Sequence, residues 1–248
     1  MKHKLLIGIG TLVAAVVILL IAEVIYIKYN GVPVAVPNIP RADESYGSAG
    51  SAIRFVVLGD STAVGQGGSY DAGIARGSAR HLGQNHRVTL TNLAVSGARS
   101  KDVLLKQLPA AVRLKPDVVM IAVGANDITH FTPTKQIVSN VRQTLAALQA
   151  ANPAVRIVLT GSPQMGAVPR FPQPIRFIAK VRTGQVNKAL DSLLQNGQIV
   201  RAPIAEQTGP TFIKHPELFA PDKFHPGTNG YGVWLPVLDK TFDALQLP

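Results

Sequence analysis

Residues 55–68, FVVLGDSTAVGQGG, have the pattern of a buried β-strand that runs into a tight turn. Four apolar residues lead into Gly59-Asp60-Ser61-Thr62, and glycines follow at positions 65, 67 and 68. A glycine-rich turn after a strand suits three roles: a loop that binds phosphate, a structural turn, or the support of a nucleophilic serine. The residues elsewhere in the chain decide among them.

Two nucleotide-binding patterns do not fit this turn. In a P-loop that starts at Gly59, Val64 stands where the second glycine belongs, and no lysine follows before Lys101. The dinucleotide pattern G-x-G-x-x-G, with an acidic residue about 20 positions later, is also missing. The G-x-S-x-G elbow of α/β-hydrolases occurs nowhere in the chain. A structural turn and a nucleophile support remain.

Outward from this stretch, short β-branched runs alternate with longer segments of helical period. Strands are predicted at 53–58, 88–93, 118–123, 155–159 and 198–201, and helices at 72–84, 100–114, 134–151, 174–196 and 228–245. Such alternation predicts an α/β fold, in which a parallel sheet is covered by helices on both faces. Functional residues of such sheets lie just beyond the carboxyl ends of the strands.

The N-terminus is predicted to be a membrane anchor. Residues 5–27, LLIGIGTLVAAVVILLIAEVIYI, hold Glu23 as their only charge and would span about 35 Å as a helix, against about 30 Å of hydrocarbon. No small-x-small cleavage site precedes Lys28, which favours an uncleaved signal-anchor over residues 1–28; secretion after cleavage is the alternative. Two lysines, at positions 2 and 4, precede the apolar segment and one, Lys28, follows it. Because the more basic flank of a membrane span tends to stay in the cytoplasm, this favours an extracytoplasmic location for the rest of the chain.

Residues 29–50, with three prolines and three glycines, are predicted to be a flexible linker, and residues 51–248 to be the folded domain. The absence of cysteine excludes disulfides and a thiolate nucleophile. The net charge of +11 comes from scattered basic residues without interleaved aromatic ones, so a solvated basic surface is predicted and no nucleic-acid partner is expected. The oligomeric state is left open.

Polar residues and glycines cluster at the predicted strand ends, in the blocks GDST, NLAVSGA and GAND, and DKFH precedes the last helix. A serine nucleophile needs a base, and the base needs an orienting acceptor. Asp222 lies three residues before His225 and can place a carboxylate beside the imidazole. The N–H groups of Ser61 and Gly97 and the amide of Asn126 could stabilise an oxyanion. Taken singly, each residue also has a structural reading: a helix cap, a turn, a loop residue or a surface histidine.

Taken together and in this order, the four blocks resemble the SGNH hydrolase superfamily, also called GDSL esterases and lipases. The resemblance runs from about Arg54 to the last helix, and Thr62 replaces the leucine of the GDSL name. It implies a flavodoxin-like three-layer α/β/α sandwich with a five-stranded parallel sheet in the order 2-1-3-4-5, here preceded by one transmembrane helix.

The same resemblance implies the roles of the site residues. Ser61 would be the nucleophile, Asp222 and His225 would complete the triad, and Ser61, Gly97 and Asn126 would form the oxyanion hole. The other candidate base, His215, lacks an aspartate three residues before it.

The predicted function is a serine esterase that acts on a small-molecule, lipid or O-acetyl glycan ester through an acyl-enzyme, without cofactor or metal. An envelope acyltransferase with the same residues and a non-catalytic binding module on the same fold are alternatives. Substrate contacts are predicted at the rim of the site and in the proline-rich segment after the fourth strand: His130, Met165, Arg170, Phe171, Arg176 and Phe177.

Overall fold

The computed structural model of the protein describes residues 2–195, 197–245 and 247. Within these residues, a six-stranded sheet has the order β1-β3-β2-β4-β5-β6. Its strands are β1 (Glu44–Tyr46), β2 (Ala52–Gly59), β3 (Arg87–Asn92), β4 (Val118–Ala122), β5 (Arg156–Leu159) and β6 (Ile199–Arg201). Strands β2 to β6 pair in parallel, and β1 pairs antiparallel with β3.

Helices connect the parallel strands and precede the domain. They are α1 (Lys2–Tyr29), α2 (Ser61–Val64), α3 (Ile74–Leu82), α4 (Ser100–Asp102), α5 (Leu108–Leu114), α6 (Ala125–Thr129), α7 (Thr134–Ala151), α8 (Ile175–Leu190), α9 (Ile204–Lys214) and α10 (Thr228–Asp243). A π-helical turn, Val103–Gln107, joins α4 to α5, and short 3₁₀ turns lie at Met165–Ala167, Asp191–Leu193 and Pro216–Leu218.

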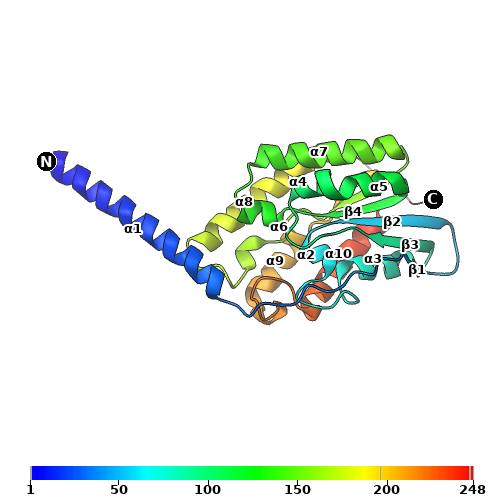
Figure 1. Ribbon diagram of the computed structural model, residues 1–248, viewed down its shortest axis with the longest axis horizontal. Coiled ribbons are helices and arrows are strands. Elements are labelled where there is room, and N and C mark those ends of the chain that lie inside the picture. Colours follow the sequence, from blue (N-terminus) through cyan, green and yellow to red (C-terminus); the bar gives the residue numbers. More distant parts are fainter. Residues whose placement is uncertain (1, 196, 246, 248) are drawn as a thin grey trace.

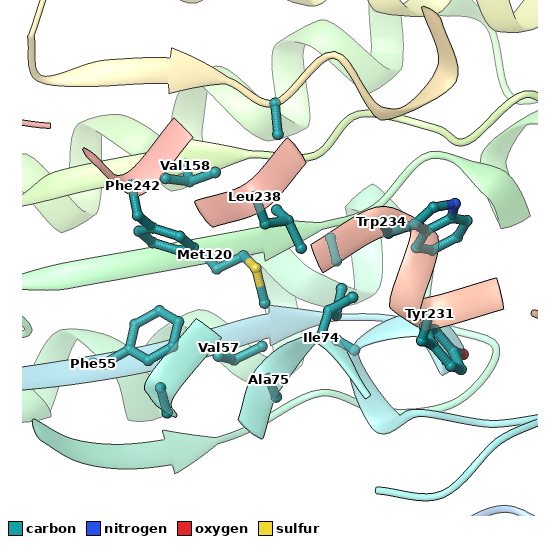
Figure 2. Close-up of a cluster of buried hydrophobic side chains, with 14 of the residues drawn as sticks. Phe55, Val57, Ile74, Ala75, Met120, Val158, Tyr231, Trp234, Leu238 and Phe242 are labelled. Atoms are coloured by element: carbon teal, nitrogen blue, oxygen red, sulfur yellow. The ribbon is translucent and has the colours of Figure 1, made fainter. Parts of the chain in front are cut away.

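Two hydrophobic cores lie on opposite faces of the sheet because successive strand residues point to opposite sides. Phe55 and Val57 of β2 pack with α3 and α10, as Figure 2 shows, whereas Val56 and Leu58 pack with α5, α7 and α8. The resulting three layers are visible in Figure 1. The predicted three-layer α/β/α architecture is confirmed.

The strand order is confirmed for the five parallel strands, since β3-β2-β4-β5-β6 is the predicted 2-1-3-4-5. The strand count needs a correction, because a sixth strand, β1, comes from the segment predicted to be an irregular linker. The register pairs Glu44 with Leu90 and Tyr46 with Val88 at the outer edge of β3. Three residues are too few to show the alternation of apolar and polar residues that predicts a strand. Tertiary contacts hold β1 in place instead.

Those contacts centre on the Glu44 carboxylate. It accepts hydrogen bonds from the Tyr70 hydroxyl at 2.7 Å and the Tyr46 hydroxyl at 3.2 Å, and it forms an ion pair with Arg76 of α3. The Arg76 guanidinium also lies over the Tyr70 ring, 4.6 Å from its centroid. Glu44 therefore joins the segment before the domain to α3.

Replacing Glu44 with alanine should lower the free energy of unfolding by about 2 kcal/mol, because the half-buried polar groups of Tyr70 and Arg76 would lose their acceptor. Urea titrations of the detergent-solubilised chain would measure the change. The neighbouring Asp43→Ala variant is the control, since exposed Asp43 accepts one hydrogen bond, from the Thr91 hydroxyl. Equal effects of the two substitutions would contradict the prediction.

Helix α1 projects away from the domain and meets it at its C-terminal end, beside α8 (Figure 1). Its segment Ile7–Ile27 has a mean hydropathy of 2.6 and is long and apolar enough to cross a membrane, as a signal-anchor or a signal peptide would be.

Candidate active site

Ser61 is held at the start of α2, directly after β2 ends. The Asp60 carboxylate caps this helix by accepting hydrogen bonds from the N–H group of Thr62 at 2.9 Å and from its hydroxyl at 2.8 Å. The Gln107 side-chain amide makes two 2.8 Å hydrogen bonds to the N–H and C=O groups of Gly59. Because Ser61 is the first residue of the helix, its N–H has no acceptor within the helix. The turn is fixed on both sides of the serine.

Ser61, His225 and Asp222 form a continuous hydrogen-bonded chain. The Ser61 Oγ atom lies 2.9 Å from His225 Nε2, and His225 Nδ1 lies 2.5 Å from Asp222 Oδ2. The other carboxylate oxygen accepts the N–H groups of Phe224 and His225, each at 3.0 Å. Burial raises the pKa of Asp222, but the hydrogen bonds from His225 and these N–H groups outweigh it and keep the pKa below its usual value. The carboxylate can therefore orient the imidazole and stabilise its protonated form.

The glycines after the serine make room for the histidine. Gly67 has a φ of 94°, and a Cβ atom there would lie 2.6 Å from the Cβ atom of His225. The Tyr231 hydroxyl donates a 2.7 Å hydrogen bond to the carbonyl of Gln66 and holds this loop in place. A side chain at position 67 would displace the imidazole. This close approach explains why position 67 is a glycine, and no phosphate-binding role is needed to explain it.

Two further donors line the same cleft as Ser61 and His225. Gly97, with a φ of 82°, lies in the turn after β3 that the hydrogen bond between Ala98 N–H and the Val95 carbonyl closes. Asn126 lies in the first turn of α6, and its Nδ2 donates one hydrogen bond, of 3.1 Å, to the Ala98 carbonyl. Gly97, Asn126, Ser61 and His225 line one open cleft. An amide nitrogen carries two hydrogens, so Asn126 has a second one that can donate to a ligand in the cleft.

A buried network supports this side of the cleft. The Asp127 carboxylate accepts hydrogen bonds from the N–H and the hydroxyl of Ser100, both at 2.8 Å, and Asn140 of α7 donates to the same hydroxyl at 3.0 Å. Burial raises the pKa of Asp127 despite these hydrogen bonds. The network joins α4, α6 and α7, and it fixes the helix that carries Asn126.

Three of the six predicted substrate contacts lie at the site. Arg170 and Phe171 line the open cleft with Ser61. Met165 lines a second, apolar pocket that extends from Ser61 and His225 towards Phe212 and is narrow, about 30 Å³ in volume. A water molecule needs about 10–15 Å³ by this measure, so this second pocket has room for a very short acyl group.

The other three lie elsewhere. His130 Nδ1 donates a hydrogen bond to the Asn126 carbonyl, 2.8 Å away, at the end of α6, and the ring borders a polar depression apart from the cleft. Arg176 donates to the carbonyls of Phe171 and Pro169. Phe177 is 61% exposed on α8. None of the three lines the cleft or the apolar pocket at Ser61, so their contact with substrate stays a prediction.

Sequence reasoning missed the residues that support the candidate triad. Gln107 lies in a π-helical turn, and Gln66 shares the cleft and accepts a hydrogen bond from Ser96 at 2.5 Å. Neither residue lies in one of the four sequence blocks that indicate a catalytic role. The rival base His215 is exposed and paired with Glu217 at 2.9 Å. Among the described residues, no group of three or more His, Asp or Glu could hold a metal ion.

The Asp60 cap makes stability depend on pH. Burial raises its pKa from 3.8 to about 6, against the hydrogen bonds from Thr62. Between about pH 4 and pH 6 the unfolded chain has already lost this proton while the folded chain holds it, so Asp60 lowers stability as the pH rises through this window.

Replacing Asp60 with asparagine keeps an acceptor for Thr62 and removes this titration. Relative to the wild type, the variant should gain about 2 kcal/mol of unfolding free energy between about pH 4.5 and about pH 7.5. Urea titrations at the two pH values would measure this difference. Parallel pH profiles for the two chains would show that Asp60 does not titrate in this window.

Comparisons with known proteins point to one family. Residues 57–233 match the model of the GDSL-like Lipase/Acylhydrolase family. A GDSL-like esterase of Mycobacterium tuberculosis is 29% identical over 236 residues, which cover 84% of this chain and 73% of the relative. Two solved structures share the fold at 18% identity. A lipase from a goat rumen metagenome has a TM-score of 0.63, with 79% of this chain and 100% of the other covered. A phospholipase A1 from Streptomyces albidoflavus has a TM-score of 0.57, with 76% and 99% covered.

Proposed function

This chain belongs to the GDSL-like lipase/acylhydrolase family, and from that premise we propose that Ser61, His225 and Asp222 hydrolyse carboxylic esters through an acyl-enzyme. The enzyme is an SGNH-type esterase. The observation that carries the assignment of residues is the continuous contact from Ser61 Oγ through the imidazole to the Asp222 carboxylate, at 2.9 and 2.5 Å.

In the first half of the reaction, His225 Nε2 takes the Ser61 proton while Oγ attacks the ester carbonyl carbon. The carbonyl oxygen becomes an oxyanion beside the N–H groups of Ser61 and Gly97 and the amide of Asn126. As the tetrahedral intermediate collapses, the alcohol leaves with the proton from His225, and the acyl group stays on Ser61. Asp222 stabilises the imidazolium in between.

In the second half, His225 takes a proton from a water molecule, whose oxygen attacks the acyl carbon. The intermediate collapses, Oγ of Ser61 recovers its proton from His225, and a carboxylic acid leaves. If a sugar hydroxyl replaced water in this step, the same site would transfer the acyl group instead. Product analysis with and without an acceptor glycan separates these outcomes.

We further propose that residues 1–28 stay attached as a single-pass anchor and that residues 51–248 act on the extracytoplasmic side, joined by residues 29–50. Support comes from the length and hydropathy of Ile7–Ile27 and from the lysines that precede it. Protease accessibility of the domain in intact cells, compared with opened cells, measures the side on which it lies.

A fluorophosphonate probe tests the site, because it labels a serine that is activated by its base. Wild type should be labelled on Ser61, and His225→Ala should lose the label. His215→Ala is the matched control and should keep it, since the structure pairs His215 with Glu217 away from the cleft. Labelling that depends on His215 and not on His225 would overturn the assignment.

A further inference from the structure

A long apolar groove lies between the membrane helix and the catalytic domain. One wall is the last three turns of α1, and the other comes from α6, α8 and the segment before α8. The residues that define it are Leu20, Val24 and Ile27 on one side and Ile128, Phe171 and Ile178 on the other. Its volume is about 480 Å³, within the range of sites that hold small molecules.

The groove is continuous with the active-site cleft. Ile27, Thr129 and Phe171 line both the groove and the cleft that contains Ser61, Gly97 and Asn126. An ester whose carbonyl lies at Ser61 can therefore extend its acyl chain between α1 and α8. The narrow pocket at Met165 has no room for such a chain.

Contacts fix the end of α1 against the catalytic loop. Arg170 Nε donates to the Ile27 carbonyl at 2.7 Å, and the Val32 N–H donates to the Pro221 carbonyl at 3.2 Å. Gly31 packs so closely on Asp222 that a Cβ atom there would lie 2.4 Å from the Asp222 carbonyl oxygen. Glu23, which an isolated helix would expose, is 5% exposed. The chain after the helix thus holds the cleft next to the outer end of the span.

The rim beside the groove has the composition of a surface that lies on lipid. Phe131, which lines the groove, is 62% exposed. Phe177, next to the groove residue Ile178 on α8, is 61% exposed and has Arg176 and Lys180 near it. Aromatic residues beside basic ones suit the headgroup region, where apolar groups enter about 5–10 Å deep. Figure 1 places α8, the helix that carries Arg176, Phe177 and Lys180, next to the end of α1.

We propose that the groove binds the acyl chain of a lipid ester that enters from the membrane beside α1. The inference rests on the esterase function proposed above and names its substrate class, namely an amphiphile with a long acyl chain. The membrane helix is then part of the substrate site as well as an anchor. The carbonyl reaches Ser61 while the chain stays among apolar side chains from Leu20 to Ile178.

The test uses the full chain reconstituted in vesicles of phosphatidylcholine and phosphatidylglycerol, with methylumbelliferyl palmitate and acetate as probes. Val24→Trp and Ile178→Trp fill the groove from its two walls. Each should lower the ratio of the two kcat/KM values, palmitate over acetate, by about tenfold, the effect of excluding about two methylene groups from an apolar site. The controls Ile25→Trp and Val181→Trp, exposed neighbours outside the groove lining, should keep the wild-type ratio.

An unchanged ratio in both groove variants would overturn the proposal. Val24 lies on α1 outside the folded domain, so its variant decides the test if Ile178→Trp does not fold. Wild type that cleaves acetate but not palmitate would refute the groove and leave the esterase standing. Wild type that cleaves neither ester, and takes no fluorophosphonate label, would refute the proposed function itself.

Discussion

Ser61→Ala is expected to lower kcat for an aryl acetate by on the order of 10⁶, because the nucleophile is lost and the remaining triad residues cannot act without it. Binding of the ester should change little, since the apolar side chains that line the cleft, such as Phe171 and Phe224, stay in place. The melting temperature should stay near that of the wild type. Release of the aryl alcohol, followed by its absorbance, measures the rate.

Ser96→Ala is the matched control for this substitution. Ser96 lines the same cleft, but its hydroxyl donates to Gln66 and has no contact with a base. It should keep its rate within about tenfold of wild type. If Ser61→Ala kept wild-type turnover, or if Ser96→Ala lost it to the same degree, the nucleophile would be a different residue.

Asn126→Ala is expected to lower kcat by about 10²–10³, the usual effect of removing one oxyanion donor. The loss should fall on kcat and leave KM nearly unchanged, because the amide meets the charge that develops in the transition state. The Nδ2 hydrogen bond to the Ala98 carbonyl shows that the amide is already fixed before substrate binds. Steady-state kinetics on a short-chain aryl ester separate the two parameters.

Asn152→Ala serves as the control for the loss of a structural amide. Asn152 caps the C-terminus of α7 and donates a 2.8 Å hydrogen bond to the Pro116 carbonyl, just before β4 begins, and it does not line the cleft. Its removal should lower stability without a selective loss of kcat. A drop of less than about threefold for Asn126→Ala would mean that the two backbone N–H groups hold the oxyanion alone.

The central parallel strands, β2, β4 and β5, were predictable because they are mostly runs of apolar residues buried on both faces. The strands predicted at 53–58 and 118–123 differ from β2 and β4 by at most one residue at either end. Helix α9 was missed because Gly209 and Pro210, which have poor helix propensity, interrupt its pattern. The helix forms nevertheless because it buries Ile204 and Phe212. The order of the strands followed from the family resemblance rather than from any local pattern.

The candidate triad was predictable because the Asp222 and His225 spacing is local and the strand ends meet at one sheet edge. The direction of side chains on α8 was not, since it depends on how that helix rotates when Ala179 and Val186 pack against the sheet. The support from Gln107 was equally hidden. Its partner, Gly59, lies 48 residues away, and no pattern in the sequence links the two.

Strand β1 has a consequence for how the enzyme is produced. It covers the outer edge of β3, whose backbone N–H and C=O groups would otherwise face solvent. Uncovered edges of this kind pair with the strands of neighbouring molecules and lead to aggregation. A shortened chain that begins at residue 51, the start of the predicted domain, would lose this cover and should aggregate, whereas one that begins before Glu44 should remain monodisperse.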